Sequence, residues 1–161
     1  MTENKTEQKS ARKVLIAMDG SKHALFAFEW YAKNVYKETD NVIMAYCAEY
    51  NINVPTTVLL ASPVAVANIV EQHEEAVLKV FKKLDEIANR YKIKHTLERI
   101  ERPHRPGEAI VKAAHQQNID LIITGTRGLG TIRRTILGSV SDYIIHHARV
   151  PVIVCKHGDH I

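Results

Sequence analysis

The chain has 161 residues, of which 45% are hydrophobic and 25% charged, and these values are typical of one globular domain with a sizeable core. Its formal net charge is only +4 and its basic residues are spread along the sequence, which disfavours a protein that binds nucleic acid through charge. No apolar run approaches the ~20 residues that cross a bilayer, so a membrane-spanning helix is not expected.

The amino-terminal stretch is polar and charged, and it lacks the apolar centre of a signal peptide. We expect residues 1–12 to form a disordered tail, residues 13–157 to form the single domain and residues 158–161 to form a second short tail. Cys47 and Cys155 each end an apolar run, and two buried thiols fit a reducing compartment better than a disulfide scaffold. The sequence therefore predicts a cytoplasmic protein.

Short apolar runs alternate with longer amphipathic stretches, and this alternation indicates βα units around a parallel sheet. The first strand should cover 14–18, and Ser21 can cap a helix that runs to about Val35. The second strand should cover 42–47. The segment 49–61 is long for a βα connection, so we expect either a mobile flap or a functional loop there.

The next helix has two possible starts, either at Ser62-Pro63, with serine as the cap and proline in the first turn, or nearer Val66. Its apolar residues recur at three- and four-residue steps, so one side should face the core. These residues are Val77, Val80, Leu84, Ile87 and Tyr91. A third strand, 94–100, mixes charged and apolar residues.

The last third of the chain predicts two further βα units. Pro106 should open a helix that ends near Asn118, and the fourth strand should cover 121–124. Another helix should cover 139–148, before a fifth strand at 152–155. The whole pattern predicts a single-domain α/β protein with five strands.

Glycines follow the fourth strand at a regular spacing. Gly125-Thr126-Arg127-Gly128 leaves the strand, and after nine intervening residues Gly138-Ser139 opens a helix. Because glycine has no Cβ, the backbone can turn here and bring its amides close to an anion. The first amides of the following helix also lack intrahelical partners, and the helix dipole is positive at that end. The spacing predicts a phosphate site; the alternative is that the glycines serve turns only.

This pattern resembles the glycine signature of the universal stress protein family, in its nucleotide-binding branch. The signature reads Gly, two residues, Gly, nine residues, Gly, then Ser or Thr, and the resemblance runs from Val14 to Val154. It implies a Rossmann-like fold: an open, mostly parallel sheet in the order 3-2-1-4-5 with helices on both faces. In such a sheet the ligand binds where the strand order reverses, here between the first and fourth strands.

The resemblance also implies a role for residues at the ends of these strands. Asp19 matches the aspartate that contacts the ribose, although it is also suited to a cap or turn before Gly20-Ser21. Main-chain atoms at Cys47 should read the adenine, and Arg127 is long enough to reach the terminal phosphates. The expected nucleotide-binding residues are Ala17, Met18, Asp19, Cys47, Thr124, Gly125, Thr126, Arg127, Gly128, Gly138, Ser139, Val140 and Ser141.

The function implied by the resemblance is an ATP-binding stress-response protein that acts as a nucleotide sensor or adaptor. ATP, ADP or AMP would be the ligand, with Mg²⁺ bridging the phosphates. The sequence has no Walker loop and no dinucleotide fingerprint, and no residue of the signature is an obvious base, so hydrolysis should be slow or absent. We assign no catalytic residue. The nine histidines do not fall at the spacings of a metal site, so we assign no metal to protein side chains either.

Two alternatives from other classes remain. One is an adenine-nucleotide hydrolase or adenylyl-transfer enzyme of the related superfamily, and the other is a nucleic-acid-binding module. The expected partners are an adenine nucleotide and a second copy of the chain. The fifth strand should lie at the sheet edge without protecting charges before Lys156, and the family often pairs through it, so we expect a homodimer through Val152–Cys155.

Overall fold

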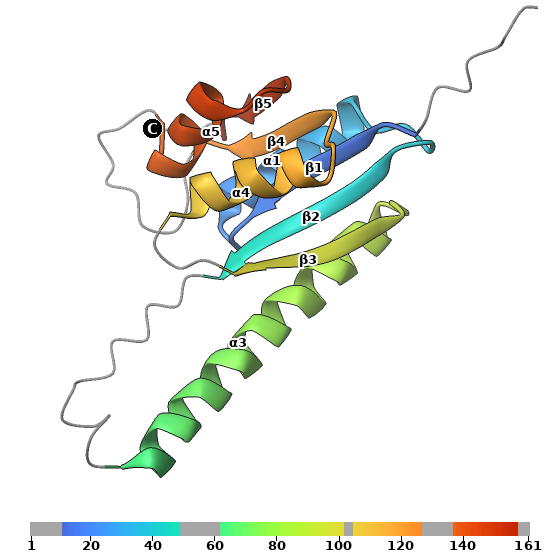
Figure 1. Cartoon of the computed structure of the whole chain (residues 1–161). Coiled ribbons are helices and arrows are strands. Elements are labelled where there is room, and N and C mark those ends of the chain that lie inside the picture. The colour runs from blue at the N-terminus through green and yellow to red at the C-terminus, as the bar shows by residue number, and fades with distance from the viewer. Residues whose placement is uncertain (1–10, 49–61, 102–104, 127–136, 158–161) are drawn as a thin grey trace, which may run out of the picture.

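The computed structural model describes residues 11–48, 62–101, 105–126 and 137–157, which form five strands and four helices (Figure 1). Along the chain the elements are β1 (Lys13–Met18), α1 (Lys22–Asn34), β2 (Asn41–Ala48), α3 (Pro63–Arg90), β3 (His95–Glu101), α4 (Pro106–Gln116), β4 (Leu121–Gly125), α5 (Ser139–His147) and β5 (Val152–Cys155). All neighbouring strands are parallel, and their order is β3-β2-β1-β4-β5. The predicted fold class and strand order are therefore confirmed.

The core has two layers because β1 is covered on both faces. Val14, Ile16 and Met18 point to the face covered by α1 and α3, where they join a buried apolar cluster. Leu15 and Ala17 point to the opposite face, which is covered by α4 and α5. A strand buried on both sides needs apolar residues without alternation, which explains the continuous apolar run in the sequence.

Serine caps set two helix starts. The hydroxyl of Ser21 accepts a hydrogen bond from the amide of Ala24 at 3.2 Å, and the hydroxyl of Ser62 accepts one from Ala65 at 3.2 Å. α3 therefore begins at Pro63, and the alternative start nearer Val66 is wrong. The expected core face of α3 is confirmed, but its buried residues all lie in the second half of the helix, and the first half extends beyond the sheet in Figure 1.

Charged side chains of the edge strand β3 form hydrogen bonds with residues in or next to the neighbouring helices. Arg99 donates two hydrogen bonds, of 2.7 and 2.8 Å, to the carboxylate of Glu74 on α3. On the other face, the carboxylate of Glu98 accepts from the side-chain amide of Gln117, which follows α4. Charges on an edge strand disfavour pairing with another chain, and here they also fix α3 and α4 to the sheet.

A polar cluster joins the start of β1 to α1 and to the turn before β2. Asp40, whose side chain is fully buried, accepts hydrogen bonds from Arg12 Nε at 3.0 Å, Arg12 Nη2 at 2.6 Å and the Tyr31 hydroxyl at 2.7 Å. The amide of Lys37 also donates to Asp40, and Arg12 donates to the carbonyl of Val35. Every charge in this cluster has a partner, which is the condition for burying a carboxylate.

The two cysteines are free thiols and both are buried. Burial raises the pKa of the Cys155 thiol to about 11. Because the thiolate is the reactive form, this cysteine is poorly suited to redox or nucleophilic chemistry at neutral pH. The thiols therefore serve the packing of the two core layers.

Candidate functional site

The strand order reverses between β1 and β4, which pair at the centre of the sheet. Their register joins Val14 to Leu121 and Ile16 to Ile123, so the two strands end at the same edge. Asp19 follows β1, and Gly125 and Thr126 end and follow β4. The structure therefore brings together at one edge a carboxylate and a glycine turn that are far apart in the sequence, as expected for a ligand crevice in a parallel sheet.

α5 begins beside the end of β4. The amide of Gly138, the N-cap, donates to the carbonyl of Thr126 at 2.6 Å. The first hydrogen bond within the helix runs from the amide of Asp142 to the carbonyl of Gly138. Ser139, Val140 and Ser141 precede that bond, so their amides belong to the first turn, and the glycine cap has no side chain to accept from them. These three amides and the positive end of the helix dipole form an anion-binding geometry.

Several donors that were expected to contact phosphate have main-chain partners instead. The amide of Thr126 donates to the carbonyl of Cys155 at 3.2 Å, and the Gly138 amide is used as described above. The Ser141 hydroxyl is buried and lies within hydrogen-bonding distance of the carbonyls of Gly138, at 2.9 Å, and Thr126, at 3.2 Å. In this structure these groups hold the turn together, which leaves the first-turn amides as the donors of this helix. Arg127 and Gly128 lie outside the described residues.

Gly125 is needed for packing as well as for any ligand. A Cβ at this position would lie 2.7 Å from both the carbonyl carbon and oxygen of His23, and 3.1 Å from the amide of Ala24. The end of β4 therefore lies directly against the start of α1, where no side chain fits. The steric role considered for the glycines is present at Gly125, and it does not exclude an approach to an anion on the other side of the turn.

Asp19 combines a turn role with a position in the crevice. Its Oδ1 accepts a hydrogen bond from the amide of Ser21 at 2.9 Å, and Gly20 between them has φ +79°, a conformation that favours glycine. Asp19 is partly exposed. An ionised carboxylate in this position is a suitable acceptor for a ribose hydroxyl.

Three of the expected nucleotide-binding residues, Ala17, Met18 and Cys47, are divided between the two faces of the sheet. Ala17 and Cys47 are buried in the cluster on the α4 side, whereas Met18 is buried in the cluster on the α1 side. Ala17 and Met18 were both expected among the nucleotide-binding residues, but the pleat points their side chains in opposite directions. Thr124 is buried within β4, and its hydroxyl lies 3.2 Å from the carbonyl of Gly125.

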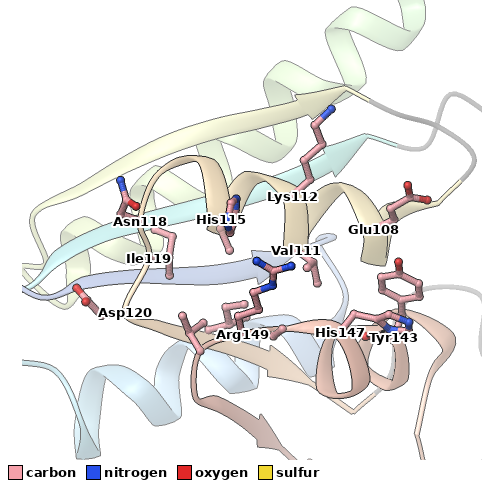
Figure 2. Close-up of a pocket in the computed structure, with 14 residues that line it drawn as sticks. Glu108, Val111, Lys112, His115, Asn118, Ile119, Asp120, Tyr143, His147 and Arg149 are labelled. Atoms are coloured by element: carbon pink, nitrogen blue, oxygen red, sulfur yellow. Dashed lines mark hydrogen bonds between the residues drawn. The ribbon is translucent and has the colours of Figure 1, made fainter.

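A separate cavity of about 610 Å³ lies between α4 and α5 (Figure 2). None of its lining residues belongs to the expected nucleotide-binding set, and no sequence motif predicted this cavity. Among the described residues, no group of three or more His, Cys, Asp or Glu is arranged to hold a metal ion. Within the same parts of the chain, no helix is both long and apolar enough to cross a membrane.

Comparison with known proteins gave a family match over most of the chain. The model of the universal stress protein family matches residues 10–156. Universal stress protein MJ0531 of Methanocaldococcus jannaschii is 32% identical over 145 residues, which cover 90% of this chain and 82% of the relative. A putative universal stress protein of Staphylococcus aureus strain USA300 is 32% identical over 146 residues, covering 90% and 84% of the two chains.

Solved structures share the fold at lower identity. Hypothetical protein MJ0577 superposes with a TM-score of 0.67 at 22% identity, covering 94% of this chain and 99% of its own. A universal stress protein family protein from Arabidopsis thaliana with AMP bound gives 0.62 at 17% identity, covering 92% and 93%. A universal stress protein in complex with cAMP gives 0.59 at 18% identity, covering 91% and 96%.

Proposed function

Because the chain belongs to the universal stress protein family, we propose that it binds an adenine nucleotide, ATP in the first place, in the crevice between β1 and β4. We propose further that the bound nucleotide makes it a sensor or adaptor in a stress response, with slow or no hydrolysis. Mg²⁺, where present, would be held by phosphate and water, as is usual for this ion.

The observation that carries the proposal is the position of the start of α5. The hydrogen bond from Gly138 to Thr126 holds the first turn of this helix beside the end of β4. The amides of Ser139, Val140 and Ser141 then lie at the same sheet edge as the carboxylate of Asp19. Amides at a helix start suit a phosphate, and an aspartate at the neighbouring strand suits a ribose.

The structural relatives support adenine as the base. Two of them hold AMP and cAMP, and both share the fold of this chain. At 17% and 18% identity this likeness covers the fold alone, so the assignment to this chain rests on its own residues. A nucleotide of about 30 heavy atoms at about 0.3 kcal/mol per atom would bind with a Kd on the order of 0.3 µM.

The first test replaces Asp19 with asparagine. Asparagine keeps a side-chain oxygen for the amide of Ser21 but removes the charge and part of the acceptor capacity offered to the ribose. We expect calorimetric titration to show ATP binding weakened by about tenfold, the loss of one charge-assisted hydrogen bond. The affinities for AMP and ADP should fall by the same factor in this variant. In the wild-type protein, GTP should bind less tightly than ATP.

The matched control is Asp120→Asn. Asp120 also accepts a main-chain amide, that of Lys13 at 2.8 Å, but it lies at the opposite edge of the sheet. ATP affinity should not change in this variant. A second variant, Gly138→Val, places a branched side chain at the N-cap without needing a left-handed backbone, since φ is −82° there, and it should remove ATP binding from a folded protein. Unchanged affinity in both Asp19→Asn and Gly138→Val would show that the nucleotide does not bind in this crevice.

We also propose a homodimer through β5. Within the described residues this strand pairs only with β4, which leaves one edge open, and Val152, Ile153 and Val154 are only half-buried. Apolar open edges tend to pair with other strands, and a two-fold axis would join two copies antiparallel. Light scattering at micromolar concentration should give twice the chain mass of 18.2 kDa, and a mass of 18.2 kDa would contradict the dimer.

A further inference from the structure

The cavity between α4 and α5 is separate from the proposed nucleotide crevice. It reaches Asp120, at the amino end of β4, whereas the crevice lies at the carboxyl end of the same strand. Its volume of about 610 Å³ falls within the range of about 300–1,000 Å³ that is usual for small-molecule sites. The space therefore has the size of a ligand site and a location of its own.

The cavity opens where α5 ends before it has covered the whole length of α4. A Cβ at Gly107 would lie 2.8 Å from Cβ of Tyr143, so α4 and α5 are in close contact near the start of α4. α5 ends at His147, and the chain then turns away through Arg149 towards β5, which leaves the second half of α4 partly uncovered (Figure 2). The floor of this space is apolar. It is lined by Val111, Ala114, Ile119, Ile122, Ala148 and Val150.

One wall of the cavity is a flat aromatic surface. The rings of Tyr143 and His147 stack with centroids 3.8 Å apart and an angle of 10° between their planes. His147 Nδ1 lies 2.9 Å from the carbonyl of Tyr143, to which it donates, and this hydrogen bond fixes the imidazole orientation. A planar aromatic ligand could stack on or against such a surface with little loss of side-chain entropy.

A guanidinium faces the space. The Arg149 side chain extends into the region between the helices, and no described residue forms an ion pair or hydrogen bond with it (Figure 2). The nearby carboxylates already have partners: Glu108 lies 3.6 Å from Arg105, and Asp120 accepts the amide of Lys13. Lys112 points away from the space in Figure 2. An unpaired guanidinium above an apolar floor favours a carboxylate, which it can bind through two parallel hydrogen bonds.

We propose that the cavity between α4 and α5 binds a small aromatic carboxylic acid, with the carboxylate on Arg149 and the ring between the apolar floor and the Tyr143–His147 wall. This site is distinct from the nucleotide crevice and does not depend on it. A polyphosphate is a poor fit, because its several negative charges would lie beside Glu108 and Asp120, which line the same space.

The test uses 2-naphthoate as the probe and the full chain as the protein. Nuclear magnetic resonance titration should show saturable shifts of the Tyr143 and His147 ring signals, with a Kd on the order of 100 µM for a ligand of this size. Arg149→Gln should weaken binding at least tenfold, the usual effect of removing a charged hydrogen-bond partner. The neutral isostere 2-naphthamide should bind the wild-type protein at least tenfold less tightly. Arg149 is exposed, so the variant should fold like the wild type.

The matched control is Arg90→Gln, at the exposed end of α3, which should leave the affinity for 2-naphthoate unchanged. Saturating ATP should also leave it unchanged, so this site can be present even if the nucleotide proposal fails. The proposal is overturned if 2-naphthoate does not bind at 5 mM, roughly fifty times the expected Kd, if Arg149→Gln binds it like the wild type, or if the shifts occur at Asp19 and Gly125 instead. It is also overturned if light scattering shows a dimer whose contact protects the Tyr143 ring and excludes the probe, since the cavity would then belong to a second copy of the chain.

Discussion

Replacing Asp40 with alanine should destabilise the protein by about 3 kcal/mol, the lower part of the range for breaking a buried ion pair. The carboxylate is fully buried, and its loss would leave Arg12 and the Tyr31 hydroxyl without their shared acceptor. The lower part of the range applies because the Arg12 side chain is 31% exposed and water can replace part of the interaction. Urea unfolding followed by circular dichroism measures the free energy of unfolding.

Asp85→Ala is the matched control for this variant. Asp85 also interacts with a basic side chain, that of His95 at 3.1 Å, but its own side chain is 52% exposed. The His95 side chain is buried, but water reaches the Asp85 carboxylate as it does in a surface pair, which contributes about 0.2–1 kcal/mol, so Asp85→Ala should cost less than about 1 kcal/mol. Equal losses in the two variants would show that the cluster around Asp40 does not hold β1, α1 and β2 together.

The same cluster determines how stability depends on pH. Burial alone would raise the pKa of Asp40, but hydrogen bonds from Arg12 and Tyr31 outweigh it and hold the pKa below its usual value of 3.8. The stability that this carboxylate contributes is therefore present above about pH 4 and is lost as the pH falls through the folded-state pKa. Burial, followed by the hydrogen bond to Asp40, raises the pKa of Tyr31 above its usual value of 10.0. The stability that the protonated hydroxyl contributes is therefore complete below about pH 10 and falls as the pH rises from there through the folded-state pKa. Tyr31→Phe should therefore make the free energy of unfolding less dependent on pH in the alkaline range.

Gly125→Ala should destabilise the protein by about 2–3 kcal/mol, as for overpacking in a closely packed interior. The added methyl group would meet the main chain of His23 at 2.7 Å, and main-chain atoms cannot rotate away as a side chain can. α1 or the end of β4 has to move, and the turn that leads to the proposed phosphate site would move with it. Thermal unfolding measures the loss of stability, and ATP titration should show weaker binding in the same variant.

Gly20→Ala separates this packing effect from backbone strain. At Gly20 the nearest atom to an added Cβ is a methyl group of Val80 at 3.8 Å, which is an ordinary contact, but φ is +79°. The cost there should come from backbone conformation alone and amount to about 1 kcal/mol. If Gly125→Ala lowered the free energy of unfolding no more than Gly20→Ala does, β4 would not pack tightly against α1 at Gly125.

The sequence predicted best those features that depend on local chemistry. Ser21 and Ser62 marked helix starts because a capping hydroxyl acts on an amide three residues away, and the apolar steps of the long helix identified its buried side. The strand order came from the family resemblance, since apolar runs alone do not say which strands are neighbours. The proposed crevice followed from that order, through Asp19 and Gly125.

Features that depend on contacts between distant segments were not predictable. The Asp40 cluster gathers Arg12 and Tyr31 from separate elements, and neither residue carries a local signal of its partner. The expected donor at Gly138 could not be known to bond to Thr126 before the two ends of that connection were seen together. The cavity beside Arg149 likewise arises from the different lengths of α4 and α5 and from the way they pack, which no local sequence pattern reveals.

The central place of β1 also governs the order in which the chain can assemble during synthesis. β1 can pair with β2 once both have left the ribosome, but its other side pairs with β4, and the hydrogen bond between Lys13 and Asp120 spans 107 positions. Until β4 emerges, the growing chain carries an apolar strand with one edge unpaired, and such an edge can join another nascent chain. The strand made first is thus completed only when most of the protein exists, so the demand for chaperones should be greatest just before residue 125 is released.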